Sequence, residues 1–213
     1  MAEVEVIAKG AEADLLLDGD WNGKKVIIKR RNQKRYRHPK LDSELRRYRT
    51  IHEADIIHRA KRAGIPTPLI YQVSPEEATI VMSYIEGEKV RDIVDRIDDD
   101  KRREMFRVIG LQAGRMHQAG IIHGDLTTSN MITDGERIVF IDFGLSEVSK
   151  EVEKRGVDLN LMHRMLTSTH FRYMELLKAS FKEGYLEEMG ERGRAAWDRM
   201  KEISRRGRYV EKT

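Results

Sequence analysis

The sequence predicts an α+β fold of two lobes, a small strand-rich lobe with one long helix and a larger lobe that is mainly helical. Five short segments with strand-like apolar patterning all lie before residue 86. After residue 86, the apolar residues recur at helical spacing, and a single hairpin pattern interrupts them. We therefore expect one lobe at 1–86, a second at 87–203 and a basic tail at 204–213.

The small lobe is predicted from turn residues that separate short strands. Strands are expected at 4–7, 13–17, 24–29, 69–73 and 79–84. Between the third and the fourth strand, Ser43 is a candidate cap for a helix that runs to Ala63. Gly64 ends this helix, and Pro66 prevents its resumption.

The larger lobe follows a short linker at 86–88. A helix is expected at 100–118, a hairpin at 130–141, and two further helices at 157–182 and 187–206. A strand-rich lobe joined to a helical lobe suits an enzyme that binds its ligand in a cleft, although a fold alone names no chemistry.

The composition is typical of a soluble protein. Of 213 residues, 39% are apolar and 36% are charged, and the net charge is +4. No apolar run is long enough to cross a bilayer, there is no cysteine, and the start of the chain lacks a signal-peptide pattern. These features predict a cytoplasmic protein without a membrane partner, and the net charge does not require a nucleic-acid partner.

The residues that indicate chemistry lie on two segments of the larger lobe. H-G-D-L-T-T-S-N occupies 123–130, and D-F-G occupies 142–144, at the end of an apolar strand. Phosphoryl transfer needs a carboxylate facing the attacking group and oxygen ligands for magnesium. Asp125, Asn130 and Asp142 would supply both, although each residue alone is also a common turn former or helix cap.

These segments resemble the catalytic loop H-R-D-L-x-x-x-N and the metal loop D-F-G of protein kinases. The resemblance implies a two-lobed protein-kinase-like fold that binds ATP and Mg²⁺, with Asp125 as catalytic base and Asn130 and Asp142 as metal ligands. By the same template, Lys29 is a catalytic residue that neutralises the phosphates, and Glu53 pairs with it. An ordinary strand lysine and a solvated helix face are the alternatives, and Glu44 is a weaker competitor for the pairing.

The same resemblance implies where the nucleotide binds. Met82 would line the back of the pocket, and the backbone of Ser83 and Ile85 would bind the adenine edge. The nucleotide-binding loop has one glycine where kinases have G-x-G-x-x-G, so close approach to the phosphates is less assured. This loop would comprise Ile7, Ala8, Lys9, Gly10, Ala11, Glu12 and Ala13.

Departures from ordinary kinases indicate a narrower family. The catalytic loop has glycine in place of arginine, no A-P-E motif follows, and the segment after Gly144 is too short to dock a peptide. K-G-A-E-A at 9–13, I-P-T-P at 65–68 and Y-I-E-G at 84–87 accompany the two loops. Together these motifs are similar to the small atypical Ser/Thr kinase of the KEOPS complex, archaeal type, over nearly the whole chain.

That resemblance implies a function and partners. The enzyme would autophosphorylate on serine or threonine and act mainly as an ATPase in a complex that forms N6-threonylcarbamoyladenosine at position 37 of tRNA. Its partners would be a threonylcarbamoyl-transferase subunit on the C-lobe side, a small subunit on the N-lobe, a dimerising subunit and, through the complex, tRNA.

Two basic segments are candidates for contact with RNA. The tail carries Arg205, Arg206 and Arg208, which could bind phosphates along RNA or could form a solvated terminus. The stretch at 29–37 is a second candidate, or a solvated loop beside the nucleotide.

Other functions remain open at this point. Aminoglycoside-type and RIO-type kinases share H-G-D and the asparagine, and a pseudokinase scaffold would bind nucleotide without turnover. An aminoglycoside pocket needs helices after Asp142 for which the chain looks too short. The intact Lys29, Asp125, Asn130 and Asp142 argue against a pseudokinase.

Overall fold

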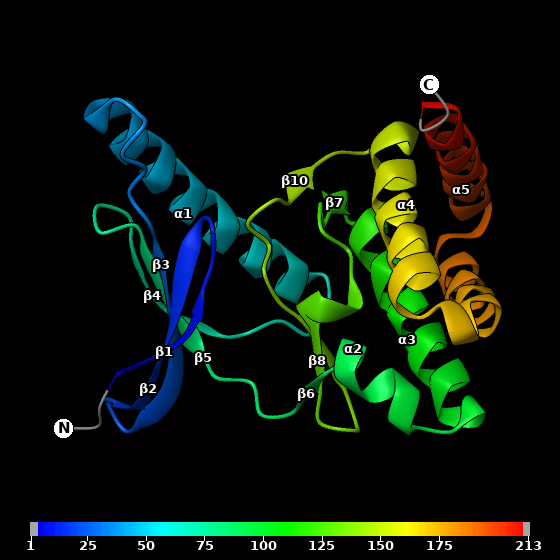
Figure 1. The fold of residues 1–213 in the computed structure, drawn as a ribbon, viewed down its shortest axis with the longest axis horizontal. Helices are drawn as coiled ribbons and strands as arrows, with labels where there is room; N and C mark the ends of the chain where they lie inside the picture. Colours follow the sequence, from blue (N-terminus) through cyan, green and yellow to red (C-terminus); the bar gives the residue numbers. More distant parts are fainter. Residues whose placement is uncertain (1–3, 211–213) are drawn as a thin grey trace.

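The chain forms two lobes that lie side by side (Figure 1). The computed structural model describes residues 4–210, with side chains up to residue 206. The strands β1 to β5 and the helix α1 form one lobe, and the helices α2 to α5 with the short strands β6 to β10 form the other. The predicted α+β class with two lobes is confirmed.

An antiparallel sheet of five strands forms the small lobe. Its central strand pairs Lys29 with Leu15 on one side and with Ile80 on the other, so two neighbours fix the register of Lys29. The strands are β1 (Glu5–Lys9), β2 (Ala13–Trp21), β3 (Lys24–Arg31), β4 (Ile70–Ser74) and β5 (Thr79–Ser83), in the order β1-β2-β3-β5-β4.

The helix α1 (Pro39–Arg62) begins earlier than the sequence predicted. Ser43 is not its cap but lies within it, because Pro39 takes the first position, where a fixed φ suits the helix and a missing N–H costs nothing. The prediction that Gly64 ends the helix is confirmed. Gly64 takes φ +79°, and the N–H of Ile65 bonds back into the last turn.

The larger lobe consists of three long helices and two small sheets. The strands β8 and β9 form the predicted hairpin, β6 joins them in the order β6-β8-β9, and β7 pairs with β10. The elements are β6 (Glu88–Lys89), α2 (Val90–Ile93), η1 (Val94–Arg96), α3 (Asp99–Gln118), β7 (Ile121–Ile122), η2 (Thr128–Asn130), β8 (Met131–Thr133), β9 (Ile138–Phe140), β10 (Glu147–Val148), α4 (Val152–Thr169), η3 (Phe171–Tyr173) and α5 (Met174–Val210).

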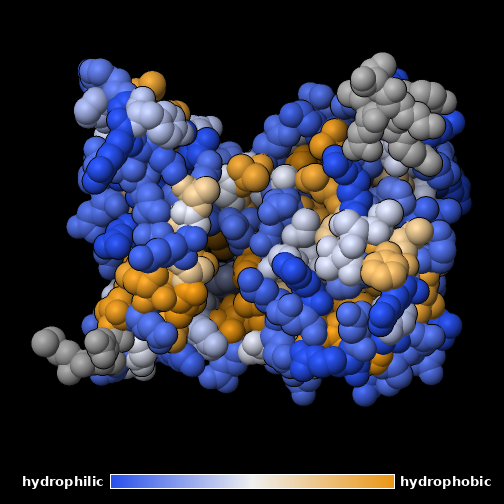
Figure 2. All heavy atoms as spheres, viewed as in Figure 1, coloured by the Kyte–Doolittle hydropathy of each residue, from blue (hydrophilic) through white to orange (hydrophobic). Residues whose placement is uncertain are grey.

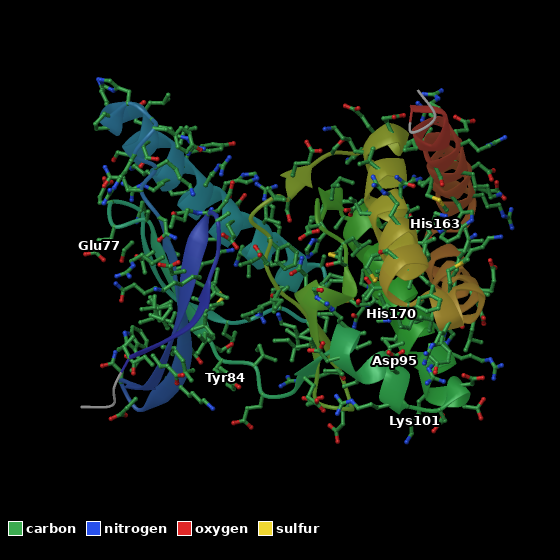
Figure 3. The ribbon with its side chains drawn as sticks, in the orientation of Figure 1. Glu77, Tyr84, Asp95, Lys101, His163 and His170 are labelled. Atoms are coloured by element: carbon green, nitrogen blue, oxygen red, sulfur yellow. The ribbon has the colours of Figure 1, made fainter. Side chains whose placement is uncertain are left out.

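The last helices divide differently from the prediction. The helix expected over 157–182 is broken at His170 (Figure 3), whose φ of −115° and ψ of 36° leave the helical region, so α4 ends before it. The helix α5 bends at Gly190, where φ is 55° and ψ is −132°, a conformation that favours glycine. It then continues to Val210, so the tail expected from residue 204 starts within a helix.

Glycines let α3 and α5 pack with their backbones almost in contact. A Cβ on Gly184 would lie 1.9 Å from the carbonyl oxygen of Arg107, and one on Gly110 would lie 2.1 Å from that of Phe181. Phe106 and Tyr185 are fully buried in the same core. The close approach therefore brings the aromatic side chains of both helices together.

One buried apolar cluster joins the two lobes. It includes Ile56 and Ile57 of α1 together with Phe106 and Phe140 of the larger lobe. Next to this shared core, the surface is hollowed between the lobes, and apolar side chains lie around the hollow (Figure 2). Within residues 4–210, no helix combines the length and the apolar character needed to span a membrane.

We predict that Gly184→Ala lowers the free energy of unfolding by about 2 kcal/mol, because the added methyl group collides with backbone of α3 that cannot move aside. Urea unfolding followed by circular dichroism measures the loss. The control is Glu183→Ala at the neighbouring exposed position of α5, for which we expect a change within about 0.5 kcal/mol. Equal stability of Gly184→Ala and the wild type would contradict the close approach of the helices.

Candidate active site

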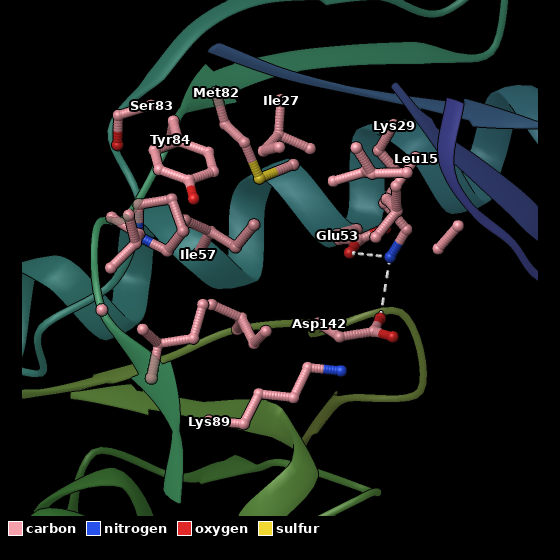
Figure 4. A pocket seen from close by; sticks show the side chains of 17 residues that line it. Leu15, Ile27, Lys29, Glu53, Ile57, Met82, Ser83, Tyr84, Lys89 and Asp142 are labelled. Carbon is pink, nitrogen blue, oxygen red and sulfur yellow. Dashed lines mark hydrogen bonds and ion pairs between the residues drawn. The ribbon is translucent and has the colours of Figure 1, made fainter. Parts of the chain in front are cut away.

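A pocket of about 340 Å³ lies between the two lobes. The side of the pocket near Met82 and Ser83, here called the hinge, is mainly apolar, and the charged side chains gather at the opposite end (Figure 4). Such a lining suits a ligand with a flat apolar part and a charged part. The lining residues are Ile7, Ala8, Leu15, Ile27, Lys29, Glu53, Ile57, Pro68, Met82, Ser83, Tyr84, Ile85, Gly87, Lys89, Ile132, Ile141 and Asp142.

Three charged side chains from separate elements meet in this pocket. The Nζ of Lys29 on β3 lies 2.6 Å from Oε1 of Glu53 on α1 and 2.7 Å from Oδ1 of Asp142, which follows β9 (Figure 4). The side chain of Glu53 is 1% exposed and that of Lys29 10%, whereas that of Asp142 is 53% exposed. The lysine therefore bonds to both lobes. The competitor Glu44 is exposed and lines a separate surface of α1.

Burial and charge act against each other in this cluster. Burial lowers the pKa of Lys29, but the carboxylates of Glu53 and Asp142 more than offset it, so the pKa of the lysine lies above its usual value. Burial likewise raises the pKa of Asp142, and the ammonium of Lys29 outweighs it, so the pKa of this carboxyl is lowered. Both groups are charged at neutral pH, as binding of phosphate and metal requires.

Arg31, two residues after Lys29 on β3, is a second buried cation on Glu53. Its Nη2 donates to Oε2 of Glu53 at 2.5 Å, and its side chain is 4% exposed. Its Nη1 lies 3.8 Å from Glu12, which also accepts a hydrogen bond of 2.7 Å from Arg49 of α1. The predicted nucleotide-binding loop is thereby linked to α1 and to Lys29. Sequence reasoning missed Arg31, although residues two apart on a strand share a face.

The predicted nucleotide-binding loop lines the pocket only in part. Ile7 and Ala8 line it, together with Leu15 from β2. Lys34 donates to the backbone carbonyl of this loop at residue 11, and Lys29 and Arg31 point inward, so part of the basic stretch 29–37 is not available to an RNA. The predicted loop residues that do not line the pocket are Lys9, Gly10, Ala11, Glu12 and Ala13.

The predicted catalytic loop, residues 123–130, lies against the predicted metal loop, residues 142–144. The N–H of Ile141 donates to the carbonyl of Asn130 at 3.0 Å, which brings Asp142 next to the end of the H-G-D-L-T-T-S-N segment. The side-chain amide of Asn130 donates to Oδ2 of Asp125 at 2.7 Å. Because a carboxylate only accepts, the amide nitrogen faces Asp125, and Oδ1 of Asn130 has no partner among the described residues. The three predicted residues are thus brought together, although Asp125 and Asn130 lie beyond the lining of the pocket.

The backbone of the metal loop is strained at Asp142. Its φ is +60°, a conformation that residues other than glycine seldom adopt. The N–H of Gly144 donates to Oδ1 of Asp142 at 3.3 Å, and Lys29 holds the same oxygen. Such strain persists only where surrounding contacts fix it, and it concentrates at functional sites.

The buried carboxylate of Asp158 fixes the backbone at the start of the predicted catalytic loop. Asp158 of α4 is 1% exposed and accepts hydrogen bonds of 2.9 Å from the N–H groups of His123 and Gly124. It also accepts one of 3.1 Å from His117, whose other ring nitrogen bonds the hydroxyl of Tyr185. Burial raises the pKa of Asp158, but the bond from His117 and nearby positive charge outweigh it, so the pKa is lowered. A fixed anion therefore orients the backbone before Asp125.

The hinge leaves two backbone groups for the adenine edge. Met82 is buried and lines the pocket with Ser83 and Ile85. The N–H of Ser83 donates to the carbonyl of Leu69 at 2.8 Å, so its backbone can meet a base only through the carbonyl. Within residues 4–210, neither backbone group of Ile85 has a hydrogen bond, which leaves its N–H available as the donor.

Several lining residues were not predicted from the sequence. The apolar strand residues among them look alike whether they face the core or a pocket, so no local signal could have found those. They are Leu15, Ile27, Ile57, Pro68, Tyr84, Gly87, Lys89, Ile132 and Ile141.

The basic tail lies far along the last helix from this pocket (Figure 1). Arg205 and Arg206 are exposed near the end of α5, and the side chain of Arg208 lies outside the described residues. The structure does not bring Arg205 and Arg206 to the pocket, so any role of theirs in binding tRNA is separate from the pocket.

Comparison with known proteins identifies the family. Residues 22–175 match the model of the RIO domain family. The KEOPS complex subunit Bud32 of Pyrococcus abyssi is 42% identical over 99% of this chain and 98% of its own length. The chain belongs to the Bud32 family of RIO-domain proteins. The RIO-type kinase considered from the sequence is therefore no rival to the KEOPS-type resemblance.

Two further relatives extend the comparison. A probable bifunctional tRNA threonylcarbamoyladenosine biosynthesis protein of Methanosarcina acetivorans is 40% identical over 97% of this Bud32-family chain, which spans 36% of that longer protein. The Rio2 kinase of Chaetomium thermophilum, solved as an ADP/Mg²⁺-phosphoaspartate complex, superposes with a TM-score of 0.65 at 18% identity. The match covers 95% of this chain and 71% of the Rio2 chain. This likeness confirms the protein-kinase-like fold.

The donor set of this Bud32-family chain fits magnesium and a nucleotide. Mg²⁺ prefers oxygen ligands and is usually held by one or two carboxylates together with phosphate oxygens. The half-exposed carboxylate of Asp142 and the unpartnered Oδ1 of Asn130 are oxygen donors on adjoining loops. The apolar hinge side of the pocket suits a base, and the charged end suits phosphates.

We predict that Glu53→Gln destabilises this Bud32-family protein by about 3 kcal/mol, because it leaves the buried cations Lys29 and Arg31 without their shared anion. The affinity for ATP should fall as well, since nothing then orients Lys29. Urea unfolding and calorimetric titration with ATP measure the two effects. Glu44→Gln, at an exposed position of the same helix, is the control and should change neither. Equal behaviour of both variants would remove Glu53 from the site.

We predict that Asp158→Asn destabilises the protein at pH 7 by about 3 kcal/mol, since backbone donors lose a buried anion. The pKa of Asp158 is lowered in the folded state, so its contribution is present above the pKa of the unfolded chain and is lost as the pH falls through the folded value. The difference between variant and wild type should therefore shrink from about pH 5 to pH 3. A difference that stays constant in urea titrations over this range would contradict an ionised Asp158.

Proposed function

We propose that this protein binds Mg-ATP between its lobes and is a Ser/Thr kinase that acts mainly as an ATPase within the KEOPS complex. There it supports the formation of N6-threonylcarbamoyladenosine at position 37 of tRNA. The contact of Lys29 with Glu53 and Asp142 carries the proposal. It assembles, from three distant parts of the chain, the ion pair and the metal ligand that kinases use.

The residues of the site divide the work by charge. Lys29, held by Glu53, which Arg31 holds in turn, neutralises phosphate oxygens from the small lobe. Asp125 accepts the proton of the attacking hydroxyl or aligns a water, and the amide of Asn130 holds its carboxylate in place. Bound Mg²⁺, held by Asp142 and Oδ1 of Asn130, would neutralise charge on the phosphates.

The short segment after the metal loop favours hydrolysis over transfer to a protein. Only residues 145–151 separate Gly144 from α4, and within them β10 pairs with β7 directly before the catalytic loop. This segment is tied to its own lobe and offers little length for docking a peptide. A carboxylate aligned near phosphate, without a docked acceptor, leaves water as the available nucleophile.

The relatives support the proposed partners. A Bud32 relative is named as a subunit of KEOPS, and a longer relative named for threonylcarbamoyladenosine biosynthesis contains a segment like this chain. We therefore propose that a threonylcarbamoyl-transferase subunit is the main partner, on the C-lobe side. We further propose a small subunit on the N-lobe, a dimerising subunit, and tRNA through the complex.

We predict that Asp125→Asn reduces the rate of phosphate release from ATP by about 100-fold or more, because the amide cannot accept a proton. Folding should be unchanged, since the amide oxygen of the new residue can still accept the bond from Asn130. Phosphate release and urea unfolding measure the two properties. Asp20→Asn, an exposed change near the end of β2, is the matched control and should retain full activity.

The same assay tests the biological assignment. Release should rise when tRNA and the KEOPS partner subunits are added, and it should not respond to aminoglycosides. Transfer of phosphate to an aminoglycoside, with no effect of tRNA, would replace the proposal with a small-molecule kinase. Equal turnover by Asp125→Asn and the wild type would end the catalytic assignment.

A further inference from the structure

One pocket-lining cation has no role in the site as described so far. Lys89 of β6 lines the pocket together with Lys29, Glu53 and Asp142, which are the other charged residues of the lining. Its side chain runs along the floor of the pocket, and its ammonium lies below Asp142, at the charged end (Figure 4). The side chain of Lys89 makes no hydrogen bond, ion pair or cation–π contact with any described residue.

The small sheet of the larger lobe fixes where Lys89 lies. Lys89 pairs with Ile132 of β8, and Ile132 pairs with Val139 of β9. The strand β8 starts directly after Asn130, and β9 ends just before Asp142, so antiparallel pairing places Lys89 at the end of the sheet that carries both proposed metal ligands.

The turn before Lys89 allows no slack. Gly87 takes φ +132°, and a Cβ there would lie 2.3 Å from the carbonyl oxygen of Thr133. The backbone of β6 therefore packs tightly against the end of β8. This packing fixes the position of the Cα of Lys89 beside the pocket. The neighbouring Glu88 is engaged with Arg96 on the outside and does not compete for the lysine.

The charge balance of the pocket calls for a second cation. Lys29 already has two carboxylates, Glu53 and Asp142, within 2.7 Å, and with Arg31 on Glu53 these four charged groups balance one another. A triphosphate keeps net negative charge even with one Mg²⁺ bound, so a further cation whose charge is not already balanced favours its binding. Lys89 is the lining cation whose charge no described side chain neutralises.

We propose that Lys89 binds the phosphates of the nucleotide from the larger lobe, opposite Lys29. This inference rests on the proposed function and adds a residue that the kinase motifs do not contain. The two lysines hold the phosphates between the lobes, so nucleotide binding draws the lobes together. A lysine suits this position because a compact ammonium on a flexible stem can follow the phosphates as the lobes move.

Binding of adenosine and of its mono-, di- and triphosphates tests the proposal without any measurement of activity. Calorimetric titration of adenosine, AMP, ADP and ATP, with Mg²⁺ present, is carried out on the wild type, Lys89→Met and Lys89→Arg. We expect Lys89→Met to lose about tenfold in affinity for ATP, as expected for one charged contact, and to bind adenosine as the wild type does. Lys89→Arg keeps the charge and should recover most of the affinity. The first nucleotide in the series that responds identifies the phosphate contacted.

Controls separate this inference from the function on which it rests. Lys40→Met removes an exposed lysine on α1 that makes no ion pair among the described residues, and it should bind every nucleotide as the wild type does. Wild-type affinity of Lys89→Met for ATP would overturn the inference, and so would an equal loss for adenosine, which indicates a contact to the ribose or a change in the fold. Wild-type protein that binds ATP but never hydrolyses it would refute the proposed ATPase and leave the Lys89 contact standing. Failure of the wild type to bind ATP would overturn both.

Discussion

The buried carboxylate of Glu53 binds two cations, Lys29 and Arg31, and the geometry of the site depends on this interaction. A carboxylate removed from water is tolerated only when its charge is balanced and its oxygens are bonded. Here each oxygen has its own cation, so both strand residues and the helix α1 are fixed relative to one another. Since α1 also shares the apolar core of the larger lobe, the small lobe is positioned over the metal loop.

The larger lobe reaches the same precision by a different route. Glycines bring the backbones of α3 and α5 together, and aromatic side chains fill the surrounding space. Within this rigid packing, Asp158 holds the N–H groups of His123 and Gly124, so the carboxylate of Asp125 projects from a fixed backbone. The two lobes then meet through Lys29 and the half-exposed, strained Asp142.

Local signals predicted the elements well where one residue type decides the backbone. Gly64 ends α1, and the five strands and the hairpin lie where turn residues separate apolar runs. The errors arose where tertiary contacts decide. Ser43 looked like a cap, but Pro39 starts the helix earlier; the apolar spacing across His170 looked continuous, but the chain turns there so that α4 and α5 can pack on each other. Two-residue strands such as β6 carry no pattern at all.

The sequence by itself predicted the chemistry, because Lys29, Asp125, Asn130 and Asp142 occupy positions that match kinase motifs in order and spacing, and the long helix with Glu53 was expected to complete them. Only the tertiary structure decided which other charges enter the site. The sequence predicted no role in the site for Arg31, Lys89 or Asp158, whose places follow from strand register, sheet order and helix packing, which bring together residues remote in sequence. A charge acts over a few ångströms of space, and the distance along the chain says little about that separation.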